Sequence, residues 1–320
     1  MPALLISVIA PVFGVVLASW VLARVVALPA RLTAGFQRLT FDALVPALLF
    51  HTMATVPLHA QFDANVLVAY YLPTLSVYAL VFAAMCAAGR SPRHANILAL
   101  AGSYSNAVLL GIPLILRAYG DNASAPLFAI VGLHSAAMFF LTTLIHELAS
   151  ANVRMASLVR DTALRLVRNP ILMALLAGAA VNAWAIALPP MLFRLTDICR
   201  TVAPYAALLS MGIAMGAGIA AYDLRGARAD AITVVLCKLV LHPLLVWLCC
   251  MWLLGPQRLH GQPGLTEQVL ITLAALPCGI NAYLFAVRFG AAEAASARAI
   301  LLSTALSIVS LAGVLYWLSP

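Results

Sequence analysis

The sequence predicts an all-α membrane protein of ten transmembrane helices, arranged as a 5+5 inverted repeat with broken, crossing fourth and ninth helices. Three observations predict this fold class. The chain is 64% hydrophobic and only 9% charged, with a mean hydropathy of +1.04. It contains ten apolar runs of membrane-spanning length. Two of these runs carry Asn, Gly and Pro at comparable places in the two halves of the chain.

The composition excludes a soluble domain, because soluble proteins carry about 25% charged residues. The six cysteines lie in apolar stretches and have neither metal-ligand nor disulfide spacing. The net charge of +8 does not indicate nucleic-acid binding, since the arginines lie singly in short loops between apolar runs. We therefore expect a lipid bilayer as the solvent, no nucleic-acid partner, and no metal or cofactor.

The predicted spans are 3–23, 39–57, 66–88, 95–117, 125–146, 170–188, 199–221, 230–254, 267–287 and 295–317. An even number of spans places both termini on one side of the membrane. Loops after odd-numbered spans hold most of the basic residues: Arg24, Arg31, Arg38, Arg90, Arg93, Arg154, Arg160, Arg165, Arg168, Arg225, Arg228, Arg288 and Arg298. The opposite side holds Arg117, Arg194, Arg200 and Arg258. Cytoplasmic loops are enriched in Arg and Lys, so both termini are expected outside.

The two halves of the chain match at a fixed spacing, which predicts an internal repeat. Pro73 and Pro243 are 170 residues apart, and so are the Tyr119-Gly120 and Phe289-Gly290 pairs. Because five spans is an odd number, the second half must enter the membrane in the opposite orientation, which is the inverted repeat of secondary transporters. The expected boundaries are 1–146 for the first repeat, 147–169 for a cytoplasmic linker and 170–320 for the second repeat.

The broken fourth and ninth spans are the predicted binding site. Their candidate residues are Asn106, Gly111, Pro113, Pro277, Gly279 and Asn281. Proline removes a backbone donor and glycine lets the chain leave the helix. Lipid does not satisfy the freed backbone groups, so the breaks must face protein or a wet cavity. There, the N-termini of half-helices favour a carboxylate.

The two asparagines in these breaks are expected to be symmetry mates that form one carboxylate site. Their amides can orient a ligand, because each offers a donor and an acceptor. The alternative interpretation is a pair of packing kinks in which Asn106 and Asn281 only satisfy the broken backbone.

Four other polar residues inside spans are accessory candidates: Ser105, Lys238, His242 and His134. Lys238 and His242 are four residues apart and share a face of the eighth span. An intramembrane cation is costly and is typical of a functional site. Lys238 is therefore expected to attract an anion or to change protonation during transport. The alternatives are snorkelling or a structural hydrogen bond for Lys238, and packing for His134.

The sequence carries no motif of an enzyme or of a primary pump. It lacks H-E-x-x-H, G-x-S-x-G and a Walker motif. The cores of the predicted spans also lack acidic residues, which argues against a carboxylate proton relay. We therefore expect a secondary transporter and not an enzyme.

The same segments resemble the auxin efflux carrier family, in its prokaryotic branch. The resemblance rests on Leu44-Val45-Pro46-Ala47-Leu48-Leu49-Phe50, on the Asn106/Gly111/Pro113 segment, on Asn169-Pro170, on Pro204-Tyr205-Ala206-Ala207-Leu208 and on Pro277-Cys278-Gly279-Ile280-Asn281. It covers nearly the whole chain. The long central cytoplasmic loop of the plant members is replaced here by the short loop 147–169.

The resemblance implies a homodimeric carrier of the bacterial inner membrane that moves a small organic anion by an elevator-type displacement. The family carries auxin in plants, and bacterial members are often described as malonate or dicarboxylate carriers. Asn106 and Asn281 match the family's crossover asparagines, which face the substrate carboxylate. The scaffold, which also forms the dimer, would comprise 1–57 and 170–221, and the transport domain 66–146 and 230–320.

Two other functions remain open from the sequence. One is a sodium-coupled organic-anion symporter of the bile-acid carrier type, which has a similar ten-span crossover. The other is a membrane sensor that binds a ligand at the crossover and signals through loop 147–169 without transport.

Overall fold

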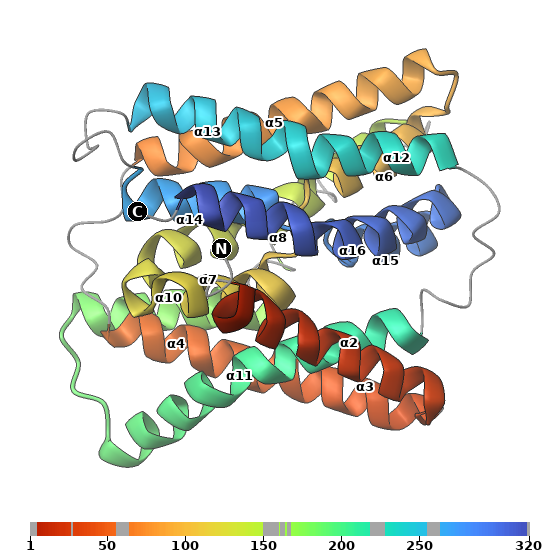
Figure 1. Cartoon of the computed structure of the whole chain (residues 1–320). Helices are drawn as coiled ribbons and strands as arrows, with labels where there is room; N and C mark the ends of the chain where they lie inside the picture. Colours follow the sequence, from red (N-terminus) through yellow and green to blue (C-terminus); the bar gives the residue numbers. More distant parts are fainter. Residues whose placement is uncertain are drawn as a thin grey trace.

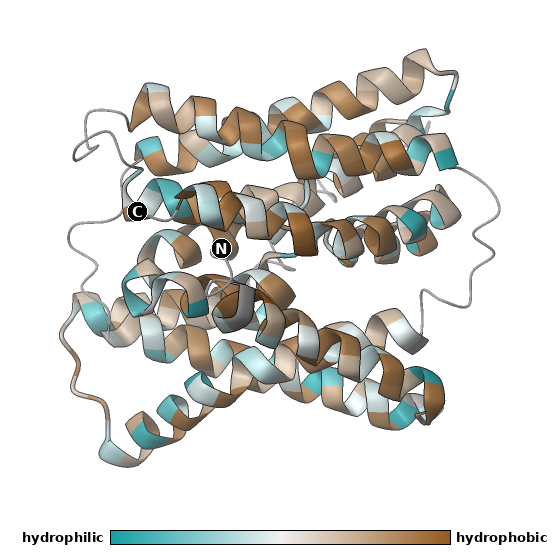
Figure 2. Ribbon diagram, viewed as in Figure 1, coloured by the Kyte–Doolittle hydropathy of each residue, from teal (hydrophilic) through white to brown (hydrophobic). Residues whose placement is uncertain are grey.

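The protein is helical in the residues that its structure, a computed structural model, describes: 5–26, 28–55, 64–149, 160, 164, 168–217, 228–254 and 263–318 (Figure 1). Most of the predicted linker 147–169 lies outside these residues. Six helical stretches in the described part are long and apolar enough to cross a membrane: Ser7–Val25, Ala64–Ala87, Asp121–Leu148, Pro190–Gly216, Arg228–Leu253 and Glu293–Leu318. Hydrophobic residues cover the helices and hydrophilic residues gather toward their ends, as expected for a multi-pass membrane protein (Figure 2).

The other four predicted spans correspond to shorter or interrupted helices. The second lies in one continuous stretch formed by α3 (Ala30–Leu39), η2 (Thr40–Leu44) and α4 (Val45–Thr55). The sixth is α10 (Pro170–Ala183). The fourth is broken into α6 (Pro92–Ser103) and a second piece, η3 (Ala107–Gly111) with α7 (Ile112–Tyr119). The ninth is broken into α14 (Leu265–Ala275) and α15 (Asn281–Phe289).

Proline accounts for the wide π-turns inside the helices. Four such turns, η1 (Leu5–Ile9), η2, η3 and η6 (Cys237–Leu241), each end two residues before a proline. These prolines are Pro11, Pro46, Pro113 and Pro243. A proline ring clashes with the carbonyl four residues earlier and offers no N–H to it. Widening the turn before the ring relieves this clash while the helix continues.

One group of helices forms the lower part of Figure 1. In it, α11 (Pro190–Ala217) packs along both α2 (Ala10–Val25) and α4, and α10 packs along α4. Glycines permit this close approach. A Cβ on Gly178 would lie 2.5 Å from the carbonyl oxygen of Phe50, and one on Gly212 would lie 2.3 Å from that of Val16.

The second group of helices forms the upper part of Figure 1. Here α5 (Ala64–Ala87) packs on α6 and on α13 (His242–Leu253). The helix α12 (Arg228–Leu236) packs on α16 (Glu293–Leu318). The remaining long helix, α8 (Ser124–Leu148), follows the short turn η4 (Asp121–Ala123) and contacts both groups.

A partly buried ion pair joins the two halves of the chain within this second group. Arg90, after α5, donates to a carboxylate oxygen of Asp230 at 3.0 Å. The Nε2 atom of His94 lies 3.2 Å from the other oxygen of Asp230. Asp230 is only 4% exposed, so its charge needs these partners.

Gly212→Ala should destabilise the protein, because its new Cβ would lie 1.9 Å from Oγ of Ser19 in α2. Such overpacking costs about 1–3 kcal/mol. Gly313→Ala is the matched control, since no atom lies within 4 Å of its new Cβ, and helix propensity favours alanine there. Thermal melting in detergent should therefore show a lower midpoint for the first variant only. Equal midpoints would contradict the close packing of α2 and α11.

Candidate functional site

The two broken segments meet at the centre of the molecule. The backbone N–H of Asn106 donates to the carbonyl of Pro277 at 3.0 Å, and that of Gly279 donates to the carbonyl of Tyr104 at 2.8 Å. Between these bonds, Ser105 and Cys278 form an isolated antiparallel bridge. Each break therefore supplies hydrogen-bond partners that the other break lacks.

The amides at the centre of each break are satisfied by side chains. The N–H of Ser105 donates to Nε2 of His134 in α8 at 3.1 Å. The N–H of Cys278 donates to Oγ of Ser303 in α16 at 3.1 Å. Both helices are the last in their halves of the chain. His134 therefore has a structural role in holding the crossing, and it does not line the cavity described below.

The backbone pairing defines a local twofold relation that differs from the sequence prediction. It exchanges Tyr104 with Pro277 and Asn106 with Gly279, since each of the two hydrogen bonds is the image of the other. Asn281 lies two residues further along, at the first position of α15. The prediction that Asn106 and Asn281 are symmetry mates is therefore wrong in this register. The crossing residues are 173 positions apart, whereas the helices repeat at 170.

Four predicted binding residues shape the crossing instead of lining a cavity. A Cβ on Gly279 would lie 2.3 Å from the Tyr104 ring, and one on Gly111 would lie 2.7 Å from Leu276. Pro113 follows the π-turn η3, which accommodates the proline ring while the helix continues into α7. Pro277 contributes its carbonyl to Asn106.

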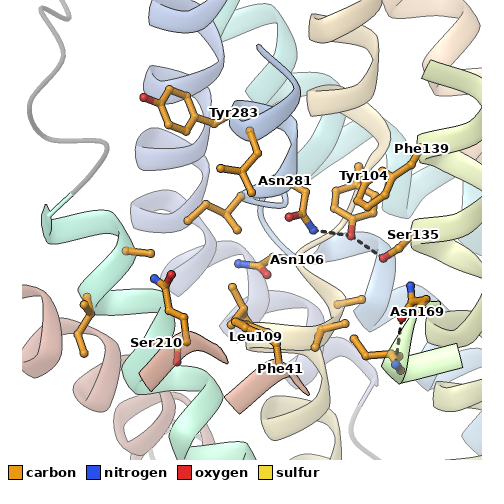
Figure 3. Close-up of a pocket in the computed structure, with 18 of the residues that line it drawn as sticks. Phe41, Tyr104, Asn106, Leu109, Ser135, Phe139, Asn169, Ser210, Asn281 and Tyr283 are labelled. Carbon is orange, nitrogen blue, oxygen red and sulfur yellow. Dashed lines mark hydrogen bonds between the residues drawn. The ribbon is translucent and has the colours of Figure 1, made fainter. Parts of the chain in front are cut away.

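A cavity of about 530 Å³ lies against the crossing, and residues of both helix groups form its walls. Asn106 and Asn281 line it, as predicted, and point into the same space (Figure 3). The other lining residues are Thr33, Gln37, Phe41, Tyr104, Ala107, Val108, Leu109, Ser135, Phe139, Asn169, Ile171, Ser210, Ile213, Ala214, Ile280, Tyr283 and Leu284.

The two asparagine amides have different hydrogen-bond partners. Nδ2 of Asn281 donates to the Tyr104 hydroxyl at 3.1 Å, and this hydroxyl lies 2.8 Å from Oγ of Ser135 (Figure 3). Nδ2 of Asn106 lies 3.4 Å from the sulfur of Met211. Because thioether sulfur is a weak acceptor, a carboxylate would be a stronger partner for the Asn106 amide.

The cavity is suited to an anion although no described lining residue carries a formal charge. Val108 and Leu109 belong to the first turn of the helix that begins at Ala107, and Asn281 begins α15. Asn169 is the N-cap of α10, where its side chain accepts from the N–H of Ile171 at 2.9 Å. Three helix N-termini, each with a positive dipole end, therefore surround the cavity.

Lys238 and His242 lie outside the cavity, on one face of the eighth span as predicted. The Nζ atom of Lys238 lies 2.6 Å from the carbonyl oxygen of Ala274 and 3.2 Å from Nδ1 of His242. Both side chains are fully buried, so the snorkelling interpretation is wrong. Ala274 is in the last turn of α14, whose negative dipole end is a favourable partner for a Lys donor.

The comparison with known proteins identifies the family. A profile of the family described as "Membrane transport protein", that of the auxin efflux carriers, matches residues 4–315. The chain belongs to this family. A protein of Rhizobium meliloti (strain 1021), named "Putative malonate transporter", is 27% identical over 312 residues, which cover 97% of this chain and 94% of the relative. The family assignment indicates a membrane transporter.

The sequence did not reveal the cavity wall opposite the crossing. In this member of the auxin efflux carrier family, that wall includes Gln37 before η2 and Ser210 in α11. Both are single polar residues in mixed stretches, so no local pattern distinguishes them. Tyr104 and Ser135 were missed as well, although each adjoins a candidate, Ser105 or His134.

Ser303→Ala should weaken the crossing, because it removes the acceptor of the buried Cys278 N–H. An unsatisfied buried donor costs about 1–3 kcal/mol. Ser307→Ala, one turn further along α16, is the matched control. Its hydroxyl is equally buried but donates to the carbonyl of Thr304 in its own helix. Thermal melting in detergent should show a clearly larger loss for Ser303→Ala. A loss no greater than that of the control would mean that this hydrogen bond does not support the crossing.

Proposed function

We propose that the protein is a secondary transporter of a small organic carboxylate, such as malonate, another dicarboxylate or an auxin-like acid. The observation that carries the proposal is the cavity at the crossing, where Asn106 and Asn281 come together among helix N-termini. The family supports transport. The name of the Rhizobium relative supports malonate as the first substrate to test.

The proposed topology is a ten-span inverted repeat in a bacterial inner membrane with both termini outside. The paired hydrogen bonds at the crossing support it, since they are related by a local twofold axis. The glycines that follow α7 and α15 support it as well. Gly120 and Gly290 have positive φ values of 72° and 60°, which glycine adopts without strain, and they end corresponding helices of the two halves.

We also propose an elevator-type mechanism. The helices α2, α4, α10 and α11 pack mainly on one another and would form a scaffold, whereas α5, α6, α8 and α12–α16 would form the moving part. The cavity lies between the two, so a displacement of one group against the other would change the side to which it opens. We expect the scaffold to form a homodimer, as the resemblance to the family implies.

The substrate site is tested by uptake of labelled malonate, malate and indole-acetate into proteoliposomes. Asn106→Ala and Asn281→Ala should each weaken uptake, because each removes a donor to a charged ligand. Such a bond contributes about 1.5–3 kcal/mol, which corresponds to about tenfold or more in affinity. Asn122→Ala, an exposed residue outside this cavity, is the control and should transport normally.

Undiminished uptake by both cavity variants would contradict the site. Varying the ion gradient across the proteoliposome membrane distinguishes the symporter and sensor functions from the proposed carrier. Uptake that requires sodium would favour a symporter of the bile-acid carrier type. Ligand-induced stabilisation without flux under any gradient would favour a sensor.

The elevator mechanism is tested by tethering the two groups at an ion pair between them. Arg200 of α11 lies 3.0 Å from a carboxylate oxygen of Asp121 in η4. In a cysteine-depleted background, Asp121→Cys and Arg200→Cys joined by a bifunctional thiol reagent should stop uptake until the tether is cleaved. Asp197→Cys with Arg200→Cys is the matched control, because Asp197 pairs with Arg200 within the same helix. Normal uptake by the tethered 121/200 variant would exclude displacement of these groups.

A further inference from the structure

A group of buried basic side chains lies beside the crossing, outside the residues that line the cavity. It comprises Lys238, which is the sole lysine of the sequence, with His242 and His134. All three side chains are at most 1% exposed. Lys238 and His242 contact Ala274 and Thr74 and do not line the cavity.

The hydrogen bonds determine which atoms donate. The hydroxyl of Thr74 donates to the carbonyl of Tyr70 at 2.7 Å, and its single proton is thereby used. Nε2 of His242, 2.9 Å from Thr74 Oγ1, must therefore donate to that oxygen. In the neutral imidazole this leaves Nδ1 as an acceptor, and Lys238 Nζ donates to it at 3.2 Å.

This arrangement accommodates Lys238 with or without its charge. Nζ makes two described hydrogen bonds, to Ala274 O and to His242 Nδ1. A neutral amine has two N–H groups and satisfies both bonds, and an ammonium adds one further proton. The exchange between the two forms therefore requires no rearrangement of these contacts.

The described surroundings give the ammonium form no carboxylate partner. The titratable groups that face this lysine are His242 on its own helix, His134 of α8 and Cys278 of the ninth-span break. Tyr70 of α5 faces the His242 ring, with centroids 5.8 Å apart. A buried positive charge without a counter-charge is costly. An anion that arrives nearby would supply the missing negative charge.

The cavity is the place where such an anion would arrive, and short connections lead to it from Lys238. Ala274 lies in the last turn of α14, and the break that follows leads to Asn281. The second connection runs through His242, which is bonded to Lys238 and faces the Tyr70 ring. The hydroxyl of Tyr70 donates to Oγ of Ser105 at 3.3 Å, and Ser105 precedes Asn106. In the low-dielectric interior, a charge on Lys238 and a charge in the cavity would attract each other across the crossing.

We propose that Lys238 is a proton-binding site coupled to the anion in the cavity, an inference that rests on the proposed function. When a carboxylate binds, one proton from water adds to the Nζ lone pair and gives the ammonium. When the carboxylate leaves, Nζ returns that proton. A monoanion and its proton then move as a neutral pair, which makes the transporter a proton–anion symporter. By linkage, the anion raises proton affinity at Nζ by the factor by which the proton raises anion affinity.

The single lysine makes a direct experiment possible on the unmodified chain. The protein is labelled with ¹⁵Nζ-lysine, and its one side-chain resonance is followed against pH in detergent, with and without malonate, malate or indole-acetate. An acid that stabilises the protein to heat should move the titration midpoint upward by about one pH unit, which is about tenfold in proton affinity. Malonamide, the uncharged analogue of malonate, should leave the midpoint unchanged.

Four results would overturn the inference, and they separate it from the proposed function. If an acid stabilises the protein while the midpoint stays in place, the coupling is wrong and the carboxylate site stands. An equal shift with malonamide would also exclude coupling to charge. If none of the three acids stabilises the protein, the proposed function fails together with the inference. In Lys238→Met, whose unbranched side chain is one atom shorter and cannot bind a proton, acid binding should lose the roughly tenfold dependence on pH that the lysine contributes. An unchanged dependence would place the proton on the substrate.

Discussion

The structure depends on one constraint, which is that a helix broken inside a membrane must find partners for its freed backbone groups without water. The two breaks solve this problem together. The backbone N–H groups of Asn106 and Gly279 donate to carbonyls of the opposite break. The backbone N–H groups of Ser105 and Cys278 donate to side chains of α8 and α16. Neither half of the chain can complete its crossing alone. The cavity beside the crossing therefore forms only where both halves are folded.

The same constraint determines which residues stand at the crossing. The two broken segments approach so closely that Gly279 has no room for a side chain beside the Tyr104 ring. Once the breaks are paired, the half-helix N-termini remain directed at the cavity, where an anion can use them. Polar atoms that the crossing does not need, such as the side-chain Nδ2 of Asn106, are then available to a ligand.

The sequence predicted the breaks, their encounter and the exposure of Asn106 and Asn281 to one cavity, because Asn, Gly and Pro together interrupt a helix that lipid would otherwise keep regular. It did not predict the register of the crossing. The helices of the two halves repeat at a spacing of 170 residues, whereas the paired residues of the two breaks are 173 apart. The spacing of the helices therefore does not determine how the irregular segments between them pair. Nor did it predict Gln37 or Ser210, since their contribution depends on the packing of distant helices and not on local pattern. The π-turns follow from proline chemistry that the sequence does contain, and could have been predicted from it.

The separation of charge from the cavity has a consequence for transport. A carrier must release its substrate as readily as it binds it, and a fixed cation in direct contact with a carboxylate would make release slow. In this structure the described cavity lining is neutral, and the buried Lys238 donates to Ala274 at the carboxyl end of α14. An anion at the crossing would therefore be held by dipoles and amides, which contribute modest free energies. A cation whose charge can be withdrawn is compatible with release, whereas a permanent arginine in the cavity would not be.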